Sequence, residues 1–288
     1  MRGDAKSMTV LSPRTAAEAV KTYAEVPSAL PFAGGTDVMV GWNLGQMNGR
    51  AVLDLSRVAE WKKIRVVGDG IDLGSLVTHA QIQAHPVLRK RFPLLVAACA
   101  TVGAAQIQNR GTIGGNIANA SPAGDTFPAL AVYEATVRAI GPNGRRGVPI
   151  SEIFAGVKKT TLRPGELIEA VFLPFPDETP TRGIFRKVGT RAAQAISKTV
   201  FAGLVWNGKG GVLTGARLAF GSMAPTVRRL YAVEEYLRGR RLNEISISAA
   251  AELLPNDVSP IDDIRSTREY RLTVSRNILT AFLKGELK

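Results

Sequence analysis

The sequence has very few of the residues from which proteins build metal and disulfide sites. Among its 288 residues there is one cysteine, Cys99, and there are two histidines, His79 and His85. One cysteine excludes an internal disulfide and any metal cluster held by several cysteines of this chain. Neither a C-x-x-C nor an H-E-x-x-H spacing occurs. Metal redox or hydrolytic chemistry that serves this protein must therefore be housed on another polypeptide.

Long hydrophobic runs and acidic side chains are also scarce. No apolar run approaches the roughly 18 residues of a membrane span, and the first seven residues are mainly charged or polar. We therefore expect a cytoplasmic protein without a membrane span.

Basic residues number 37 against 24 acidic ones, which gives a formal net charge of +13. This excess of positive charge requires a polyanion or an acidic partner to be considered. Aromatic residues make up only 6% and the basic residues form short scattered clusters, so a nucleic-acid-binding module is a remote alternative.

The first part of the chain has the pattern of mixed strands and helices, and its hydrophobic fraction of 45% can furnish a sizeable core. Ser12 and Pro13 indicate the start of a helix over residues 16–23. Residues 29–55 have the pattern of a small βαβ unit with a glycine loop after its first strand. The segments that follow are predicted to be a hairpin over 64–76, a helix carrying Ile82 and Val87, a buried helix over 94–102 and a long glycine-rich loop over 108–125.

A proline-rich polar stretch marks the best candidate for a domain boundary, near residue 178. Beyond it, three antiparallel strands are predicted at 184–188, 199–206 and 212–221, followed by helices at 226–237, 245–253 and 266–283. The sequence therefore predicts an α+β fold of two domains. These are 1–178, with lobes of about 1–57 and 58–178, and the smaller 179–288.

Two glycine-rich loops carry the strongest functional signal, Ala33-Gly-Gly-Thr-Asp37 and Gly111-Thr-Ile-Gly-Gly-Asn116. Adjacent glycines allow successive backbone N–H groups to point at one anion, and a helix starting at Asp37 would add its positive end. Each pair could instead be only a tight turn. The polar residues after the second loop, Asn116, Asn119, Ser121 and Asp125, favour a binding site, because an acidic side chain such as Asp125 can accept hydrogen bonds from ribose hydroxyls. The pattern thus predicts a diphosphate site.

Two longer motifs contain these loops. They are Pro31-Phe-Ala-Gly-Gly-Thr-Asp37 and Gln108-Asn-Arg-Gly-Thr-Ile-Gly-Gly-Asn-Ile-Ala-Asn-Ala-Ser-Pro-Ala-Gly-Asp125. With them the sequence resembles the FAD-binding, or medium, subunits of the molybdenum hydroxylases, the family of xanthine dehydrogenase and carbon monoxide dehydrogenase. The segments Gly165–Ile168, Phe185–Lys187 and Leu218–Pro225 also match in order, so the resemblance covers essentially the whole chain.

The resemblance implies a two-lobed FAD-binding domain of the vanillyl-alcohol oxidase-like (PCMH) type, followed by a C-terminal domain like that of carbon monoxide dehydrogenase flavoproteins. By position, Pro31, Phe32, Ala33, Gly34, Gly35, Thr36, Asp37 and Val38 would hold the diphosphate of a noncovalent FAD together with Thr112, Gly114, Gly115 and Asn116. Asp125 would bind the ribose or ribityl side, Val102 and Ile168 would pack near the flavin, and Lys187 would contact the cofactor from the second domain. Core packing is the alternative for Val102 and Ile168.

The resemblance also implies an oxidoreductase subunit of a heterotrimer. FAD would receive electrons from 2Fe-2S clusters on a small partner subunit and pass them to an external acceptor, while a large partner subunit carries the molybdenum cofactor. No catalytic side chain and no metal ligand is expected on this chain. Residues 188–196 lack the acidic residues found in eukaryotic relatives, which puts NAD in doubt as the acceptor. A self-contained flavin oxidase or dehydrogenase with the same FAD fold is the main alternative.

Overall fold

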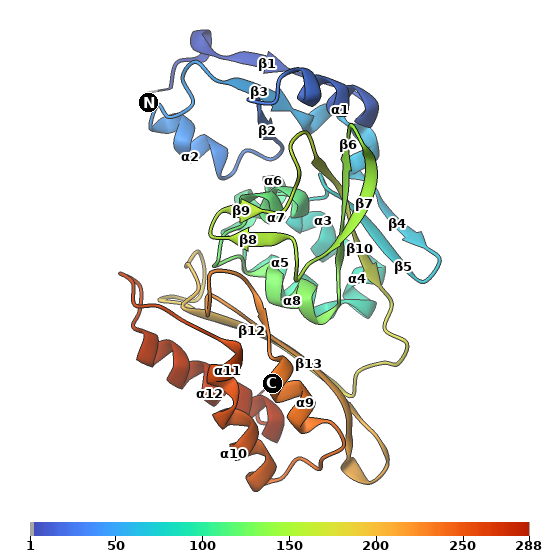
Figure 1. Cartoon of the computed structure of the whole chain (residues 1–288), viewed down its shortest axis with the longest axis vertical. Coiled ribbons are helices and arrows are strands. Elements are labelled where there is room, and N and C mark those ends of the chain that lie inside the picture. The colour runs from blue at the N-terminus through green and yellow to red at the C-terminus, as the bar shows by residue number, and fades with distance from the viewer. Residues whose placement is uncertain (1–2, 288) are drawn as a thin grey trace.

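Three units follow one another along the long axis of the molecule in chain order (Figure 1). The computed structural model describes residues 3–287. It places a small lobe at the N-terminal end, a larger lobe in the middle and a helix-and-sheet unit at the C-terminal end. The mixture of helices with mainly antiparallel sheets confirms the predicted α+β class.

The small lobe is built on a three-stranded sheet with the strand order β1-β3-β2, in which both pairs are parallel. Its elements are β1 (Thr9–Leu11), α1 (Ala16–Glu25), β2 (Leu30–Phe32), α2 (Val38–Asn43) and β3 (Ala51–Asp54). Parallel pairing of β2 with β3 across α2 confirms the predicted βαβ unit. The predicted cap of the first helix was wrong: the Thr15 hydroxyl, not Ser12, accepts from the Glu18 N–H, so Pro13 lies before the helix.

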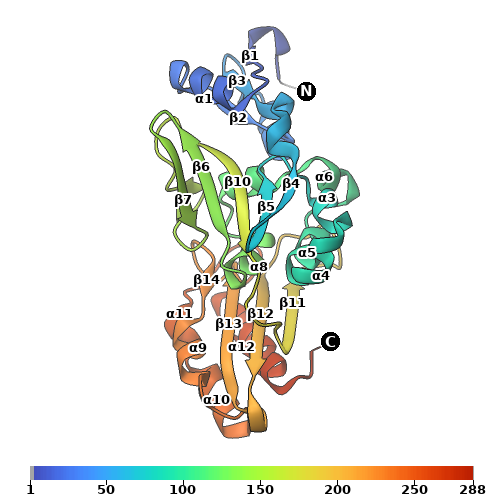
Figure 2. The same cartoon turned by 90° about the vertical axis from the view of Figure 1, so that its right-hand side faces the viewer.

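The larger lobe contains a five-stranded antiparallel sheet with the order β4-β5-β10-β6-β7. Its strands are β4 (Ile64–Val67), β5 (Gly70–Gly74), β6 (Thr136–Gly141), β7 (Gly144–Pro149) and β10 (Leu167–Pro174), with a separate hairpin of β8 (Phe154–Gly156) and β9 (Lys159–Thr160). Its helices are α3 (His79–Ala84), α4 (Pro86–Arg91), α5 (Pro93–Ala100), α6 (Ala105–Arg110), α7 (Ile113–Asn119) and α8 (Thr126–Val132). Figure 2 shows β4 and β5 as a hairpin, as predicted.

Two predictions for this lobe were wrong. The helix expected to carry Ile82 and Val87 is two helices, α3 and α4, because Pro86 starts a new one. The expected loop over 108–125 contains α7. Ile113 and Ile117 lie one turn apart on α7 and are both fully buried, so packing of one small apolar face stabilises a helix that the glycines alone do not predict.

The C-terminal unit pairs a four-stranded antiparallel sheet with helices on one of its faces (Figure 2). The sheet order is β11 (Arg182–Val188), β12 (Thr199–Asn207), β13 (Leu213–Gly221) and β14 (Arg228–Arg229), and the helices are α9 (Tyr231–Leu237), α10 (Glu244–Glu252), α11 (Leu254–Asp257) and α12 (Arg268–Lys284). The three predicted strands are confirmed. The helix predicted over 226–237 was wrong in its first part, because residues 228–229 form β14 and α9 begins only at Tyr231. The predicted boundary near residue 178 falls between β10 and β11, and the division there stays a prediction.

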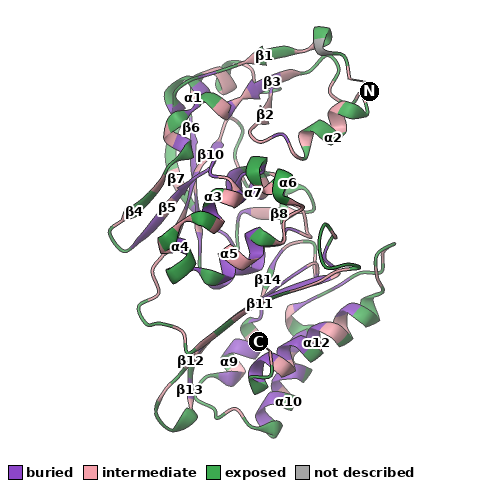
Figure 3. Ribbon diagram, turned by 180° about the vertical axis from the view of Figure 1, so that it is seen from behind, coloured by how far each residue is buried: buried purple, intermediate pink, exposed green. Residues whose placement is uncertain are grey.

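Hydrophobic packing joins the three units. One cluster links the small lobe to the larger one through Leu53, Trp61 and Leu167. The main cluster of the larger lobe includes the buried Cys99. It also contains Ala202 and Ala219 from the C-terminal sheet. A third cluster lies between that sheet and the helices of the C-terminal unit. Figure 3 shows α2 and α6 without buried residues. Within residues 3–287, no helix has the length and hydrophobicity of a membrane span.

Candidate functional site

The first glycine loop joins β2 to α2 and leaves a run of backbone donors unused. The N–H groups of Gly34, Gly35, Thr36 and Asp37 donate no hydrogen bond to any described residue. Gly35 is buried and has a φ of +77°, a conformation that glycine adopts without strain. Unpaired N–H groups that are partly shielded from water are costly unless a ligand or water accepts from them. Four consecutive free donors therefore fit an anion such as a diphosphate.

The two glycine loops are in direct contact. A Cβ added to Gly34 would lie 1.8 Å from the carbonyl oxygen of Arg110, and one added to Gly111 would lie 3.5 Å from the Thr36 hydroxyl oxygen. Only a residue without a side chain allows this approach of backbone to backbone. The structure therefore brings together two predicted segments that are more than seventy residues apart in the sequence.

The second glycine loop uses its backbone donors internally. The Gly114 N–H donates to the Ser75 carbonyl at 2.9 Å, and the Gly115 N–H donates to the Thr112 hydroxyl at 3.0 Å. A Cβ on Gly114 would lie 2.5 Å from that of Ser75. The Asn116 N–H donates to the Thr112 carbonyl. This loop is thus shaped by close packing, and its predicted contribution of N–H groups to the diphosphate is not available in this arrangement.

His79 supports the second loop from the larger lobe. Its backbone N–H donates to the Gly111 carbonyl, and its ring Nδ1 lies 3.4 Å from the Cys99 sulfur. Burial lowers the pKa of His79 to about 4, so the ring is neutral near pH 7. Burial likewise raises the pKa of the Cys99 thiol. Both side chains therefore have a packing role here.

Asp37 does not cap the helix that follows it. Its carboxylate instead accepts from the Asn119 side-chain amide at 3.1 Å and lies 3.6 Å from the Lys158 ammonium group. Lys158 also donates to the Asn119 side-chain oxygen at 2.6 Å. These three residues come from the first loop, the end of α7 and the turn between β8 and β9. Lys158 was not among the predicted site residues, and no local sequence signal marks it.

A second polar cluster lies where the C-terminal unit meets the larger lobe. The Lys187 ammonium group on β11 lies 2.6 Å from Asp125 Oδ2 and donates to the Thr101 carbonyl at 3.0 Å. Both charged side chains are largely buried, with exposed fractions of 12% and 9%. Burial raises the pKa of the Asp125 carboxyl, and the adjacent Lys187 partly offsets that rise. The structure thus joins Asp125 to Lys187, and it joins Lys187 to Thr101, the residue before Val102.

Helix α7 connects the two clusters. Its first turn belongs to the second glycine loop, and its last residue, Asn119, contacts Asp37. Asn116, between them, accepts a short hydrogen bond from the hydroxyl of Thr126, the neighbour of Asp125. One short helix therefore fixes the spacing between the glycine loops and the Asp125 carboxylate.

Several predicted residues are apolar and take no part in these polar contacts. Phe32 and Val38 line an apolar cavity of about 270 Å³ in the small lobe, together with Met39 and Trp42. Ile168 is 7% exposed and belongs to the main hydrophobic cluster, which agrees with the alternative of core packing, whereas Val102 is half-buried. Pro31 and Ala33 are also half-buried, on either side of Phe32.

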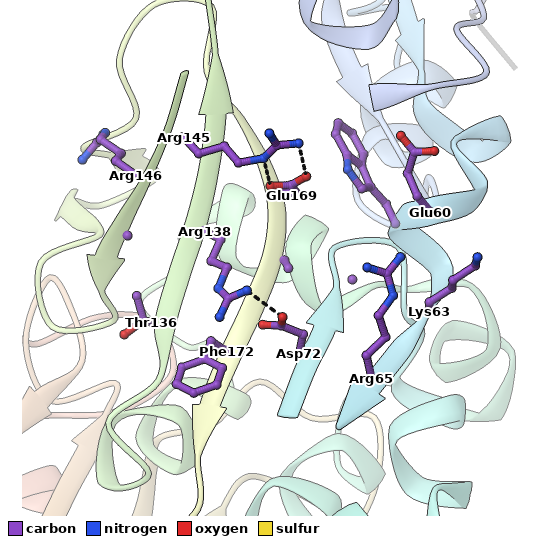
Figure 4. Close-up of a pocket in the computed structure, with 14 residues that line it drawn as sticks. Glu60, Lys63, Arg65, Asp72, Thr136, Arg138, Arg145, Arg146, Glu169 and Phe172 are labelled. Atoms are coloured by element: carbon purple, nitrogen blue, oxygen red, sulfur yellow. Dashed lines mark hydrogen bonds and ion pairs between the residues drawn. The ribbon is translucent and has the colours of Figure 1, made fainter. Parts of the chain in front are cut away.

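A larger cavity of about 540 Å³ lies elsewhere, against the five-stranded sheet (Figure 4). Asp72 and Arg138 face it, and strand alternation places them on the side of the sheet opposite the buried Leu73 and Val137. Arg138 pairs with Asp72 at 2.6 Å, and Arg145 pairs with Glu169 through two hydrogen bonds. None of the predicted cofactor-binding residues lines this cavity. Two ion pairs within the lining hold four of its charged side chains, and the Arg145 side chain is 65% exposed, so the cavity has the character of a solvated sheet face.

Comparison with known proteins covers both parts of the chain. The family described as "FAD binding domain in molybdopterin dehydrogenase" matches residues 6–176, and the family described as "CO dehydrogenase flavoprotein C-terminal domain" matches residues 184–285. The first match alone spans more than half of the 288 residues.

Individual relatives agree with these matches. The chain is 30% identical to the xanthine dehydrogenase FAD-binding subunit of Escherichia coli O157:H7, covering 90% of this chain and 88% of that protein. It is 29% identical to the carbon monoxide dehydrogenase medium chain of Hydrogenophaga pseudoflava, covering 95% of each. A solved structure of carbon monoxide dehydrogenase from the same organism superposes with a TM-score of 0.89 at 27% identity, covering 95% of this chain and 94% of that one.

Proposed function

Because this chain belongs to the family of FAD-binding subunits of the molybdenum hydroxylases, we propose that it is the electron-transfer subunit of such an oxidoreductase complex. In that role it holds FAD so that electrons from 2Fe-2S clusters on a small partner subunit reach an external acceptor. A large partner subunit carries the molybdenum cofactor. When bound, FAD supplies the redox chemistry, and the protein supplies binding, orientation and electrostatics.

The run of free donors from Gly34 to Asp37 is the observation that carries this proposal. Hydrogen bonds to charged groups contribute about 1.5–3 kcal/mol each, so a few of them can hold a diphosphate without a dedicated lysine. The contact with Gly111 gives the site a second wall. The Thr112 hydroxyl and the Asn116 side chain, at the start of α7, complete the proposed cradle.

The flavin end of the cofactor is assigned to the junction of the two proposed domains, 1–178 and 179–288. Lys187 and Asp125 form a buried charged pair there, and Val102 is adjacent to Thr101, which accepts from Lys187. Electron transfer to and from FAD needs no side-chain acid or base from this chain. Ile168 supports this part of the site indirectly, because it packs in the same hydrophobic cluster as the buried residues of α7.

The first test is the flavin content of the purified chain. We expect the visible absorption bands of a flavoprotein, and denaturation should release FAD into the supernatant because the binding is noncovalent. A colourless protein that does not bind added FAD in a fluorescence titration would contradict the proposal.

The second test separates a subunit from a self-contained oxidase. Affinity purification from the native host should recover an iron–sulfur protein and a molybdenum protein in stoichiometric amounts, and the isolated chain should show negligible turnover of small alcohols or phenols with O₂. Rapid turnover without partners would support the independent oxidase instead. Stopped-flow reoxidation with NAD and with artificial acceptors would then identify the class of acceptor.

A further inference from the structure

The backbone of Lys158 has a left-handed conformation that the residue type does not favour. It lies in the turn of the β8–β9 hairpin with a φ of +57°, a conformation that is uncommon for residues other than glycine, asparagine and aspartate. Its backbone N–H donates to the carbonyl of Ala120, which itself has a φ of +45°. Left-handed residues other than glycine cost free energy, and Ala120 is the C-cap of α7. The hydrogen bond to Ala120 ties the tip of the β8–β9 hairpin to the end of α7 and brings the Lys158 side chain to Asn119.

That place is beside Asp37. The Lys158 ammonium group lies 3.6 Å from the Asp37 carboxylate and 2.6 Å from Asn119 Oδ1, while Asn119 Nδ2 lies 3.1 Å from Asp37. We refer to Asp37, Asn119 and Lys158 as the polar latch. It joins the small lobe to the larger lobe at the glycine loops, away from the hydrophobic cluster that joins the same two lobes near α1.

As a contribution to stability the polar latch is weak. The side chains of Lys158 and Asp37 are 51% and 66% exposed, and exposed ion pairs usually contribute between about 0 and 1 kcal/mol. Its position has a stronger consequence for anion binding. Asp37 is the last of the four residues with free N–H groups, so its negative charge stands next to the place assigned to the diphosphate. An uncompensated carboxylate there would repel the ligand that the loop is built to hold.

We propose that Lys158 is a positioning residue for FAD, which neutralises Asp37 and, through Asn119, holds the two lobes together around the diphosphate. Lys158 acts through Asp37 and does not itself bind phosphate. This inference rests on the proposed binding of FAD by the glycine loops. It adds Lys158, which neither the motif nor the resemblance assigns to the site, and it gives Asn119, one of the polar residues after the second loop, a defined role there.

The first experiment compares Lys158→Asn with Lys159→Asn in the full chain. Asparagine tolerates the left-handed conformation, so the first variant removes the charge without adding backbone strain. Lys159 is the exposed neighbour, and its variant makes the same change of net charge outside the polar latch. After removal of FAD, fluorescence titration at low salt should give a dissociation constant about 10-fold higher for Lys158→Asn and within about 2-fold of wild type for Lys159→Asn.

Melting temperatures of the two FAD-free variants serve as the structural control and should agree with wild type within about 2 °C. Lys158→Arg should restore the affinity, because it keeps the charge. The difference between Lys158→Asn and wild type should shrink as salt is raised from about 20 mM to 500 mM, since screening weakens exposed charges. Equal affinities for the Lys158 and Lys159 variants would overturn the inference.

The second experiment repeats the substitution in an Asp37→Asn background. If Lys158 acts by neutralising Asp37, its removal should raise the dissociation constant by no more than about 2-fold when the carboxylate is absent. The same 10-fold loss in both backgrounds would show direct contact with phosphate and would overturn the positioning role. Wild-type protein that binds no FAD would instead contradict the proposed function itself, so the two failures are distinguishable.

Discussion

The two ends of the proposed FAD site are built on different physical principles. At the glycine loops the free donors belong to the backbone, the nearby charges are exposed, and the decisive feature is the absence of side chains at Gly34 and Gly114. At the domain junction the polar groups are side chains, and Asp125 and Lys187 are almost completely buried. The first end depends on shape and the second on charge. Substitutions at the two ends should therefore change different measured properties, namely the affinity for FAD at the glycine loops and the free energy of unfolding at the buried pair.

Breaking the buried pair should have the largest effect. Lys187→Met leaves the Asp125 carboxylate buried without its counter-charge, and removal of one partner from a buried pair typically costs 3–5 kcal/mol. We expect a loss of about 4 kcal/mol in the free energy of unfolding near pH 7, measured by urea denaturation. Arg186→Met is the matched control, because Arg186 is the exposed neighbour on β11 and its loss should change stability by less than about 0.5 kcal/mol.

The same variant should reveal the protonation of Asp125. Burial already raises the pKa of this carboxyl and Lys187 lowers it, so removing Lys187 raises the pKa further. A carboxyl with a raised pKa in the folded state penalises folding only when ionised, and the penalty disappears as pH falls below its unfolded pKa. The deficit of Lys187→Met relative to wild type should therefore shrink as pH falls from 7 toward 4. A deficit that is constant with pH would mean that lost packing, and not charge, is the cause.

Changing the shape of the first loop should have the next largest effect, which is measured as the affinity for FAD. A Cβ on Gly34 would meet the Arg110 carbonyl oxygen at 1.8 Å, and backbone cannot rotate away as a side chain can. Gly34→Ala should raise the dissociation constant for FAD at least 100-fold, or about 3 kcal/mol. Gly215→Ala, where the nearest atom is an ordinary 3.5 Å away, provides the control. Wild-type affinity in Gly34→Ala would contradict the contact between the loops.

The smallest contrast lies within the second loop. A Cβ on Gly114 would lie 2.5 Å from Ser75 Cβ, whereas one on Gly115 would meet only the Thr112 hydroxyl oxygen, at 2.9 Å. We expect Gly114→Ala to lower the free energy of unfolding by about 2 kcal/mol through overpacking. Gly115→Ala should change it by less than about 0.5 kcal/mol, because the gain in helix propensity offsets the displacement of the Thr112 hydroxyl that caps α7. Equal losses in thermal or urea denaturation would remove the distinction between the two glycines.

The elements with regular periodicity could be predicted from the sequence. The βαβ unit of the small lobe, the β4–β5 hairpin and the long strands β12 and β13 all have clear patterns and clear turn residues. Helix α7 could not be recognised, since two adjacent glycines and two asparagines disfavour a helix locally and only the burial of Ile113 and Ile117 stabilises it. The cap at Thr15 was missed because Ser12 and Pro13 are equally good local signals.

In the candidate site, too, local sequence patterns could be predicted and features that depend on tertiary contacts could not. Glycine motifs mark the two loops, and the resemblance marks Asp125 and Lys187, which the structure joins across 62 residues of sequence. The different use of N–H groups in the two loops could not be foreseen, because it depends on whether Ser75 or a ligand accepts from them. Lys158 could not be found either, since its relevance comes from a hairpin tip that meets α7 only in three dimensions.

The Asp125–Lys187 pair also sets an order of events during synthesis. Asp125 leaves the ribosome 62 residues before Lys187, an interval of roughly 3–12 seconds at ordinary elongation rates of about 5–20 residues per second. Throughout that interval the nascent larger lobe holds a carboxylate whose counter-ion has not yet been made. The lobe must keep this carboxylate hydrated or protonated until β11 is translated and docks. The pairing of Asp125 therefore cannot precede translation of Lys187 in the C-terminal unit.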